Sequence, residues 1–195
     1  MNINRLKTNK GNLIDSICII KPKVFSDKRG FFYESWNELD FNTNICKRNF
    51  CQDNHSKSCK GAIRGIHYQI PPFEQGKLVR CTRGSIFDIA VDLRKYSATY
   101  KEWIGIELND INNSQLWVPE GFGHGFLTLS EDAEVQYKVT KEWNKKSEKS
   151  ILWNDPDLKI AWPLNNLAKI KPIISTKDSK GMKIREAEKF GFVFE

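Results

Sequence analysis

Apolar and polar residues alternate in short runs along most of this chain, with the two-residue period of β-strands. In Ser85–Arg94 the odd positions from 87 to 93 are apolar, whereas Asp88 and Asp92 stand at even positions. Trp103–Leu108 has its apolar residues at even positions, and Glu134–Thr140 has them at odd positions. Each run predicts a strand with one face turned towards a core.

Further short runs predict more strands, and Gly, Pro, Asn and Asp residues separate them. These runs are Ile17–Ile20, Phe31–Trp36, Asn49–Ser56, Gln115–Val118 and Gly125–Leu129. Phe25–Gly30 has the composition of a turn, and Glu38–Asn44 is predicted as a short helix or an irregular loop.

The spacing of the predicted strands is about ten residues, with no helical spacers between them, which favours a β-sandwich or jelly roll over βαβ units. Lys183–Phe190 has helical composition, and Gly191 is a plausible helix stop. The prediction is therefore an all-β protein with short peripheral helices, one of them near the C-terminus.

The 195 residues suggest a single domain over 1–195. Met1–Asp15 is polar and does not resemble a signal peptide, and apolar runs such as Ile17–Ile20 are too short to span a bilayer. The five cysteines are odd in number and include no Cys-x-x-Cys pair. We therefore expect free thiols and a cytoplasmic protein that does not bind a membrane.

The formal net charge of +7 could favour binding to a nucleic acid, a membrane surface or a small polyanion. The basic residues are spread out, and the densest cluster, Lys141–Lys149, also contains Glu142 and Glu148. That cluster is typical of a solvated loop. Because no basic stripe with interleaved aromatic residues occurs, we expect no binding to nucleic acid.

The most reactive stretch of the sequence is Arg64–Gln69, which places His67 among apolar and aromatic neighbours. Gln75 and Lys77 follow within ten residues, after a turn at Pro71-Pro72. An imidazole has an unperturbed pKa of about 6.5 and suits general-base work near neutrality. Together with the neighbouring cations, it predicts proton transfer on an anionic substrate.

His67 could instead be a core histidine or a metal ligand. Metal-binding cupins place two histidines two residues apart on one strand, whereas here Tyr68 and Gln69 follow His67. His124 would be the one remaining partner, and two imidazoles are too few ligands for a metal centre. We therefore expect no metal.

A general base also needs an orienting partner, and no carboxylate lies near His67 in the sequence. Asp178, Asp88 and Asp92 are all candidates, and the sequence does not choose among them. Arg64 and His67 are three residues apart and would point to opposite faces of a regular strand. Both can line one pocket only if Gly65 carries a bulge.

Two more residues could belong to a site or to the core. Lys77 would share a face with Val79 and Cys81, where it would be costly without an anion, unless it lies solvated at a strand edge. Tyr137 lies between two inward-facing valines, which is usual for a core tyrosine with one hydrogen bond. The sequence leaves both possibilities open for each residue.

An ordered set of motifs over nearly the whole chain resembles the dTDP-4-dehydrorhamnose 3,5-epimerase family, which acts in L-rhamnose synthesis. The motifs are Phe25-x-Asp27-x-Arg29-Gly30-x-Phe32-x-Glu34, Gln52-x-Asn54-x-Ser56-x-Ser58, Arg64-Gly65-Ile66-His67-Tyr68-Gln69, Gln75-x-Lys77-Leu78-Val79, Val91-Asp92-Leu93-Arg94, Pro119-x-Gly121-Phe122-x-His124-Gly125-Phe126, Trp153-Asn154-Asp155-Pro156 and Trp162-Pro163. Each motif is weak alone, but their order is specific.

This resemblance implies a metal-free, cofactor-independent, cupin-type jelly roll (a double-stranded β-helix) that forms a homodimer. It implies that His67 is the base, paired with Asp178, that Tyr137 is the acid on the opposite face, and that Lys77 stabilises an enolate. The positions that it assigns to the substrate site are Arg29, Glu34, Gln52, Asn54, Arg64, Gln75, His124 and Glu148. Trp143 stands where the family often has tyrosine, so contacts there are expected to differ.

The implied reaction inverts C3 and C5 of dTDP-4-dehydro-6-deoxy-D-glucose, a nucleotide diphosphate sugar, to give dTDP-4-dehydro-L-rhamnose. The nearest competing hypothesis is an epimerase that inverts a single centre of another 4-keto nucleotide sugar. A non-catalytic sugar-nucleotide binding module and a metal-dependent cupin enzyme are two more hypotheses, from different functional classes. The presence of His67, Tyr137 and Asp178 argues against the binding module.

Overall fold

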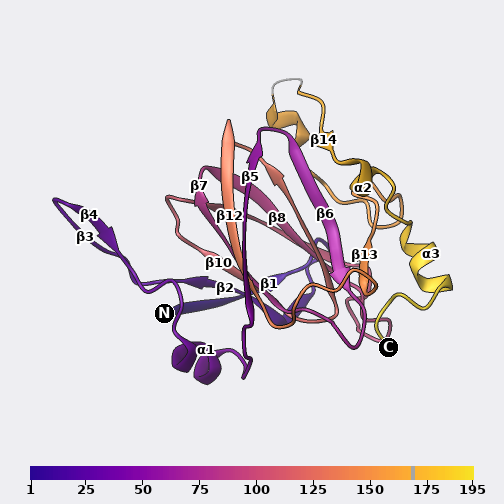
Figure 1. Ribbon diagram of the computed structural model, residues 1–195, viewed down its shortest axis with the longest axis horizontal. Coiled ribbons are helices and arrows are strands. Elements are labelled where there is room, and N and C mark those ends of the chain that lie inside the picture. Colours follow the sequence, from indigo (N-terminus) through magenta and orange to yellow (C-terminus); the bar gives the residue numbers. More distant parts are fainter. Residues whose placement is uncertain (168–169) are drawn as a thin grey trace.

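The computed structural model describes residues 1–167 and 170–195, which form two antiparallel β-sheets packed face to face as a jelly roll (Figure 1). The first sheet has the strand order β1-β2-β10-β7-β12-β5. Its strands are β1 Asn2–Lys7, β2 Leu13–Lys21, β5 Gln52–Cys59, β7 Lys77–Arg83, β10 Gln115–Val118 and β12 Asp132–Val139.

The second sheet has the order β13-β6-β11-β8-β9, and β14 joins it by pairing in parallel with β6. Its strands are β6 Ala62–Gln69, β8 Ser85–Asp92, β9 Trp103–Asn109, β11 Phe122–Thr128, β13 Glu148–Ser150 and β14 Ile173–Ile174. The predicted all-β class, the jelly roll and the short peripheral helices are confirmed. The helices are α1 Glu38–Asn44, α2 Thr176–Ser179 and α3 Ile184–Lys189, with a 3-10 turn at Leu164–Leu167.

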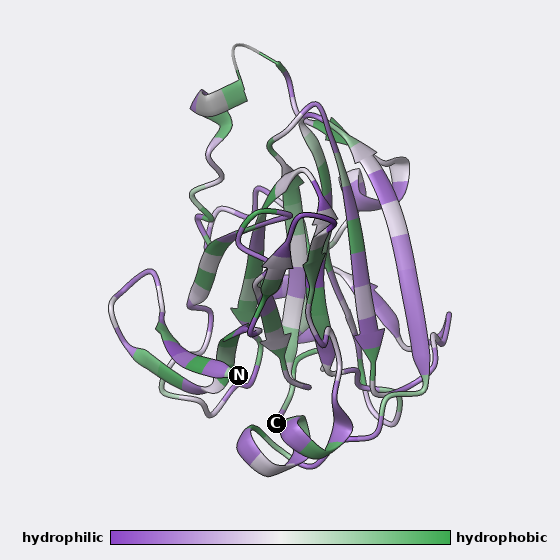
Figure 2. Ribbon diagram, turned by 90° about the vertical axis from the view of Figure 1, so that its left-hand side faces the viewer, coloured by the Kyte–Doolittle hydropathy of each residue, from purple (hydrophilic) through white to green (hydrophobic). Residues whose placement is uncertain are grey.

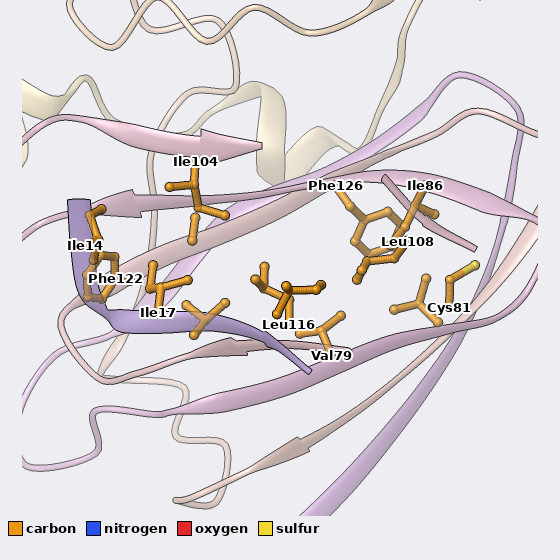
Figure 3. Packing of buried hydrophobic residues seen from close by; sticks show 14 of the residues in the cluster. Ile14, Ile17, Val79, Cys81, Ile86, Ile104, Leu108, Leu116, Phe122 and Phe126 are labelled. Atoms are coloured by element: carbon orange, nitrogen blue, oxygen red, sulfur yellow. The ribbon is translucent and has the colours of Figure 1, made fainter. Parts of the chain in front are cut away.

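The inner faces of the two sheets meet in an apolar core, seen from close by in Figure 3. This core includes Ile17, Val79, Ile104, Leu116 and Val135, all nearly or fully buried. Figure 2 shows hydrophobic and hydrophilic residues alternating along individual strands. The alternation explains why each strand turns one set of side chains inwards.

The outer face of the second sheet is buried as well, under the C-terminal segment that carries α2 and α3 (Figure 1). Ile89, Val91 and Leu93 of the β8 region pack there against Ile184 and other C-terminal residues. Strand β8 is therefore covered on both faces, and its two aspartates are fully buried, which alternation alone does not predict.

A third apolar cluster lies on the outer face of the first sheet. Trp117 and Leu78 pack there against Phe41 of α1, and the two aromatic ring centroids lie 5.1 Å apart. Asn37 caps the helix by accepting a hydrogen bond from the Asp40 backbone N–H. The structure thus resolves Glu38–Asn44 as a helix.

The expected strand over Phe31–Trp36 is only partly formed. Residues 25–32 make a hairpin, with β3 Phe25–Asp27 and β4 Gly30–Phe32, that extends away from both sheets (Figure 1). Phe25, Phe31 and Phe32 are 54%, 63% and 68% exposed. Because the hairpin has no core to pack against within the chain, β4 ends at Phe32.

Strand β6 contains the predicted irregularity at Gly65. His67 pairs with His124 and Arg64 pairs with Phe126, so three residues of β6 advance against two residues of β11. Gly65 has φ +113°, and a Cβ there would lie 2.6 Å from the His124 carbonyl oxygen. The bulge turns Arg64 and His67 into the same cavity.

We predict that Gly65→Ala destabilises the protein by about 3 kcal/mol or more, because the added Cβ would have to displace the β11 backbone. Urea denaturation measures the change. Gly11→Ala is the matched control, since Gly11 has φ +87° but no atom within 4 Å of the added Cβ. It should cost only about 1 kcal/mol. Equal costs for the two variants would contradict the steric explanation.

Candidate active site

A cavity of about 470 Å³ opens between the two sheets, beside the apolar core. Its lining is mostly polar and comes from both sheets and from the loop after β12: Gln52, Asn54, Ser56, Arg64, His67, Tyr68, Gln69, Gln75, Lys77, His124, Phe126, Tyr137, Trp143 and Glu148. Ten of the thirteen residues that the sequence assigned to the site are among these fourteen.

His67 projects from β6 and contacts Asp178 of α2, with its Nε2 atom 2.5 Å from Oδ1. Asp178 is 3% exposed. Burial on its own would raise the pKa of Asp178, but the hydrogen bond and charge of His67, with the Ser175 hydroxyl, lower it overall. The structure thus pairs His67 with Asp178, the partner that the family resemblance implied and that the residue types alone left open beside Asp88 and Asp92.

Lys77 points inwards from β7 and is 7% exposed. Its Nζ donates a hydrogen bond to the His67 carbonyl oxygen at 3.2 Å. Burial lowers the pKa of Lys77 to about 8, against the attraction of Asp88 and Glu148. The ammonium is therefore buried in the lining of the cavity, bonded to the His67 backbone, rather than solvated at a strand edge.

Tyr137 enters the same cavity from β12 of the first sheet, whereas His67 enters it from the second sheet. Burial raises the pKa of the Tyr137 phenol, and the positive charge of Arg64 opposes that change. The imidazole and the phenol therefore stand on opposite walls, as two groups must when one removes a proton and the other returns it on the far face.

His124 forms a second imidazole–carboxylate pair. Its Nε2 lies 2.7 Å from Asp88 Oδ1, and both side chains are buried. His124 lines the cavity next to His67, because the two residues are register partners on β11 and β6. Asp88, which sequence reasoning considered for His67, is thus the partner of the other histidine.

The remaining lining residues form a polar rim that is partly organised by hydrogen bonds. Gln52 donates to Asn54 at 2.8 Å and accepts from the Trp143 backbone at 3.1 Å. Arg64 donates from Nε to the Ser58 hydroxyl at 2.8 Å. These contacts leave Trp143 55% exposed at the mouth of the cavity.

Glu148 is paired with Lys177, whose Nζ lies 2.5 Å from Oε1. Burial would raise the pKa of Glu148, but the Lys177 contact lowers it overall. Sequence reasoning missed Lys177, although it stands immediately before Asp178 on the same short helix. That adjacency is the signal that could have revealed it.

Two predicted substrate residues do not reach this cavity within one chain. Arg29 lies on the β3–β4 hairpin with its side chain 90% exposed, and it pairs with Asp27 at 2.6 Å. Glu34 follows the hairpin and lines a different hollow beside Trp36.

Within residues 1–167 and 170–195, no group of three or more His, Cys, Asp or Glu side chains is arranged to hold a metal ion. The helices in these same residues are all too short or too polar to cross a membrane.

A family model described as dTDP-4-dehydrorhamnose 3,5-epimerase matches residues 12–186. The chain belongs to this family. It is 47% identical over 189 residues to the dTDP-4-dehydrorhamnose 3,5-epimerase of Shigella flexneri, covering 96% of this chain and 99% of that protein. The resemblance seen in the sequence is confirmed, and with it the class of the protein, an isomerase.

The solved structures agree. The dTDP-6-deoxy-D-glucose-3,5-epimerase of Legionella pneumophila in complex with dTDP-4-keto-L-rhamnose superposes with a TM-score of 0.85 at 40% identity, covering 94% of each chain. A dTDP-4-dehydrorhamnose 3-epimerase from Streptomyces niveus is less similar, at 34% identity over 92% of this chain and 85% of that protein.

We predict that Lys77→Met stabilises the protein by about 2 kcal/mol at pH 7 while removing activity. The folded-state pKa of about 8 lies below the ordinary 10.5, so the unfolded chain holds this proton more tightly. The native lysine therefore lowers the free energy of unfolding by its full amount below pH 8. This loss of stability becomes smaller as the pH rises from 8 towards 10.5.

Urea denaturation between pH 6 and pH 9.5 measures this difference. Lys138→Met, on the outer face of the neighbouring β12, is the control, because Lys138 forms a surface pair with Asp53 and lies 5.8 Å from the Trp36 ring centroid, outside the cavity. It should change stability by about 1 kcal/mol or less. A less stable Lys77→Met variant at pH 7 would contradict the prediction.

Proposed function

We propose that this protein inverts C3 and C5 of dTDP-4-dehydro-6-deoxy-D-glucose to give dTDP-4-dehydro-L-rhamnose, a precursor of L-rhamnose. The observation that supports the proposal is that His67 and Tyr137 line one cavity from different sheets, with the buried ammonium of Lys77 bonded to the His67 carbonyl. Membership of the epimerase family supports the same reaction.

The chemistry follows from the 4-keto group of the substrate, which acidifies the hydrogens on C3 and C5. His67 removes one of these protons, and the Asp178 carboxylate stabilises the imidazolium that forms. The electron pair moves onto the C4 oxygen as an enolate. Lys77 supplies a fixed positive charge for this oxygen.

Inversion requires a proton to arrive on the other face of the same carbon, and Tyr137 is the donor on that side. The C4 carbonyl re-forms as the phenol gives up its proton, and exchange with solvent then restores the phenol and the imidazole. No oxidation state changes, so the sequence of steps needs no redox cofactor.

The polar rim binds the nucleotide end of the substrate in this proposal. Arg64 offers a guanidinium suited to diphosphate oxygens, and Gln52, Asn54 and Gln75 offer neutral polar groups. Trp143 at the mouth is placed to stack on a ring. Glu148 would hold Lys177 at the rim through their ion pair.

We predict that turnover in deuterium oxide introduces deuterium at both C3 and C5 of the product, because each proton is removed and then replaced from solvent-equilibrated groups. Proton NMR of the purified product measures it. His67→Ala should abolish exchange at both carbons while retaining the fold. Tyr137→Phe should lower product formation more than dTDP affinity.

Deuterium at only one carbon would instead establish an enzyme that inverts a single centre. The lower identity to the Streptomyces niveus 3-epimerase supports the two-centre reaction.

We further propose that the active unit is a homodimer in which each β3–β4 hairpin completes the site of the other subunit. The hairpin extends away from its own sheets and exposes three phenylalanines. It also carries Arg29, whose guanidinium is not used by the chain's own cavity. Burying those rings against a second copy would remove exposed apolar surface.

The free state of all five cysteines fits the reducing cytoplasm.

We predict that Arg29→Ala and His67→Ala, each impaired alone, restore activity when they are combined in one dimer. Co-expression with two different tags and purification through both isolates the mixed dimer. One of its two sites then has an intact His67 and an intact partner Arg29, so it should show about half the wild-type activity per dimer. An inactive mixed dimer would show that Arg29 does not act across the interface.

A further inference from the structure

Asp88 is a fully buried carboxylate with an incomplete set of partners, and it contacts His124, which lines the cavity. It is 0% exposed, and its Oδ1 contacts the Nε2 atom of His124 at 2.7 Å. Its Oδ2 atom is also buried and has no hydrogen-bond partner in the part of the chain that the structure describes. A carboxylate in this state is costly unless another charge compensates it.

Asp92, on the same strand, is a buried carboxylate whose negative charge is fully compensated. It is equally buried, yet its oxygens accept hydrogen bonds from Arg94, Ser97 and Thr99. Asp92 is therefore a closed structural network with its own cation. Asp88 has an imidazole and no adjacent arginine, so its charge must be balanced from inside the cavity.

Lys77 is a buried cation that lines the same cavity as His124. His124, which holds Asp88, is the register partner of His67, and the His67 carbonyl accepts the Lys77 hydrogen bond. Two hydrogen bonds and one register pair thus link the four residues. Burial lowers the pKa of Lys77 to about 8, and Asp88 is the largest of the charges that oppose this change.

Other charged or titratable groups lie around Lys77, on four strands and on helix α2. They are Arg64 and His67 from β6, His124 from β11, Tyr137 from β12, Glu148 from β13, and Lys177 and Asp178 from α2. Each of the three carboxylates has one close partner: Glu148 has Lys177, Asp178 has His67 and Asp88 has His124. Among the described residues, Asp88 differs from the other two in keeping a buried oxygen, Oδ2, without a hydrogen-bond partner.

We propose that Asp88 is a positioning residue of the epimerisation: its carboxylate fixes the His124 ring in the cavity wall and supplies the counter-charge for the Lys77 ammonium. This inference rests on the proposed function, because it assigns Lys77 to the enolate oxygen. Asp88 touches neither the nucleotide rim nor the reacting carbons, so it acts through Lys77 and His124.

The test is the pH profile of kcat/KM for Asp88→Asn, which keeps the shape of the side chain and removes its charge. Loss of one nearby opposite charge should lower the pKa of Lys77 by about one unit. The variant-to-wild-type ratio of kcat/KM should then be near one at pH 6, and fall about threefold at pH 7.5 and about tenfold at pH 9. Affinity for dTDP should not change.

Asp92→Asn is the matched control, since Asp92 is an equally buried carboxylate on the same strand. It should lower the melting temperature without moving the alkaline limb of the profile. Asp88→Glu, which restores the charge, should restore the wild-type limb. Asp88→Thr is a second neutral variant suited to a strand, and it should behave as Asp88→Asn does.

A ratio that is independent of pH would overturn the proposal, and so would an equal shift in Asp92→Asn. If neither neutral variant folds, the carboxylate serves the fold and not the reaction, and the proposal is wrong. Failure of the proposed function is a separate outcome, because the wild-type protein itself would then not turn over the 4-keto sugar.

Discussion

The hydrogen bond between His67 and Asp178 joins two parts of the chain that are 111 residues apart. Its carboxylate lies on a four-residue helix, which is too short to be stable alone. The helix is held because the segment after β13 buries apolar side chains on the outer face of the second sheet, around residues such as Ile89 and Ile184. The dyad thus depends on a hydrophobic cluster on the outer face of that sheet, of which Tyr68 also lines the cavity.

The space between the two sheets contains an apolar region and an adjoining region of charged and polar side chains. One region is filled by Ile17, Val79 and their neighbours, and the adjoining region holds Lys77, His124 and Asp88 with little access to water. Removing these groups from water costs stability, and their mutual compensation limits that cost. The same low-dielectric surroundings strengthen the field that Lys77 exerts on a developing enolate. The apolar core and the outer cluster supply the stability that the polar region costs.

The hairpin of residues 25–32 extends away from both sheets of its own chain (Figure 1). Its aromatic side chains are exposed, its arginine is distant from the cavity, and yet its residues form part of the family motif. A second copy of the chain would bring these features together with the rim of the other cavity. In that arrangement, assembly and substrate binding would use the same surface.

The sequence by itself determined the all-β class, most strand positions and the helix near the C-terminus, because the two-residue period and turn residues such as Gly121 act locally. It also determined the family, and it offered a bulge at Gly65 as one of two ways to place Arg64 and His67, the one that the structure shows.

The family resemblance implied Asp178 as the partner of His67, but the residue types alone did not decide which carboxylate meets which imidazole. Asp178 and Asp88 are equivalent in a sequence, and long-range packing assigns the first to His67 and the second to His124. Tertiary packing also decided that Lys77 is buried and that β8 is buried on both faces. The two-residue period of a strand does not show that the C-terminal segment packs over its outer face.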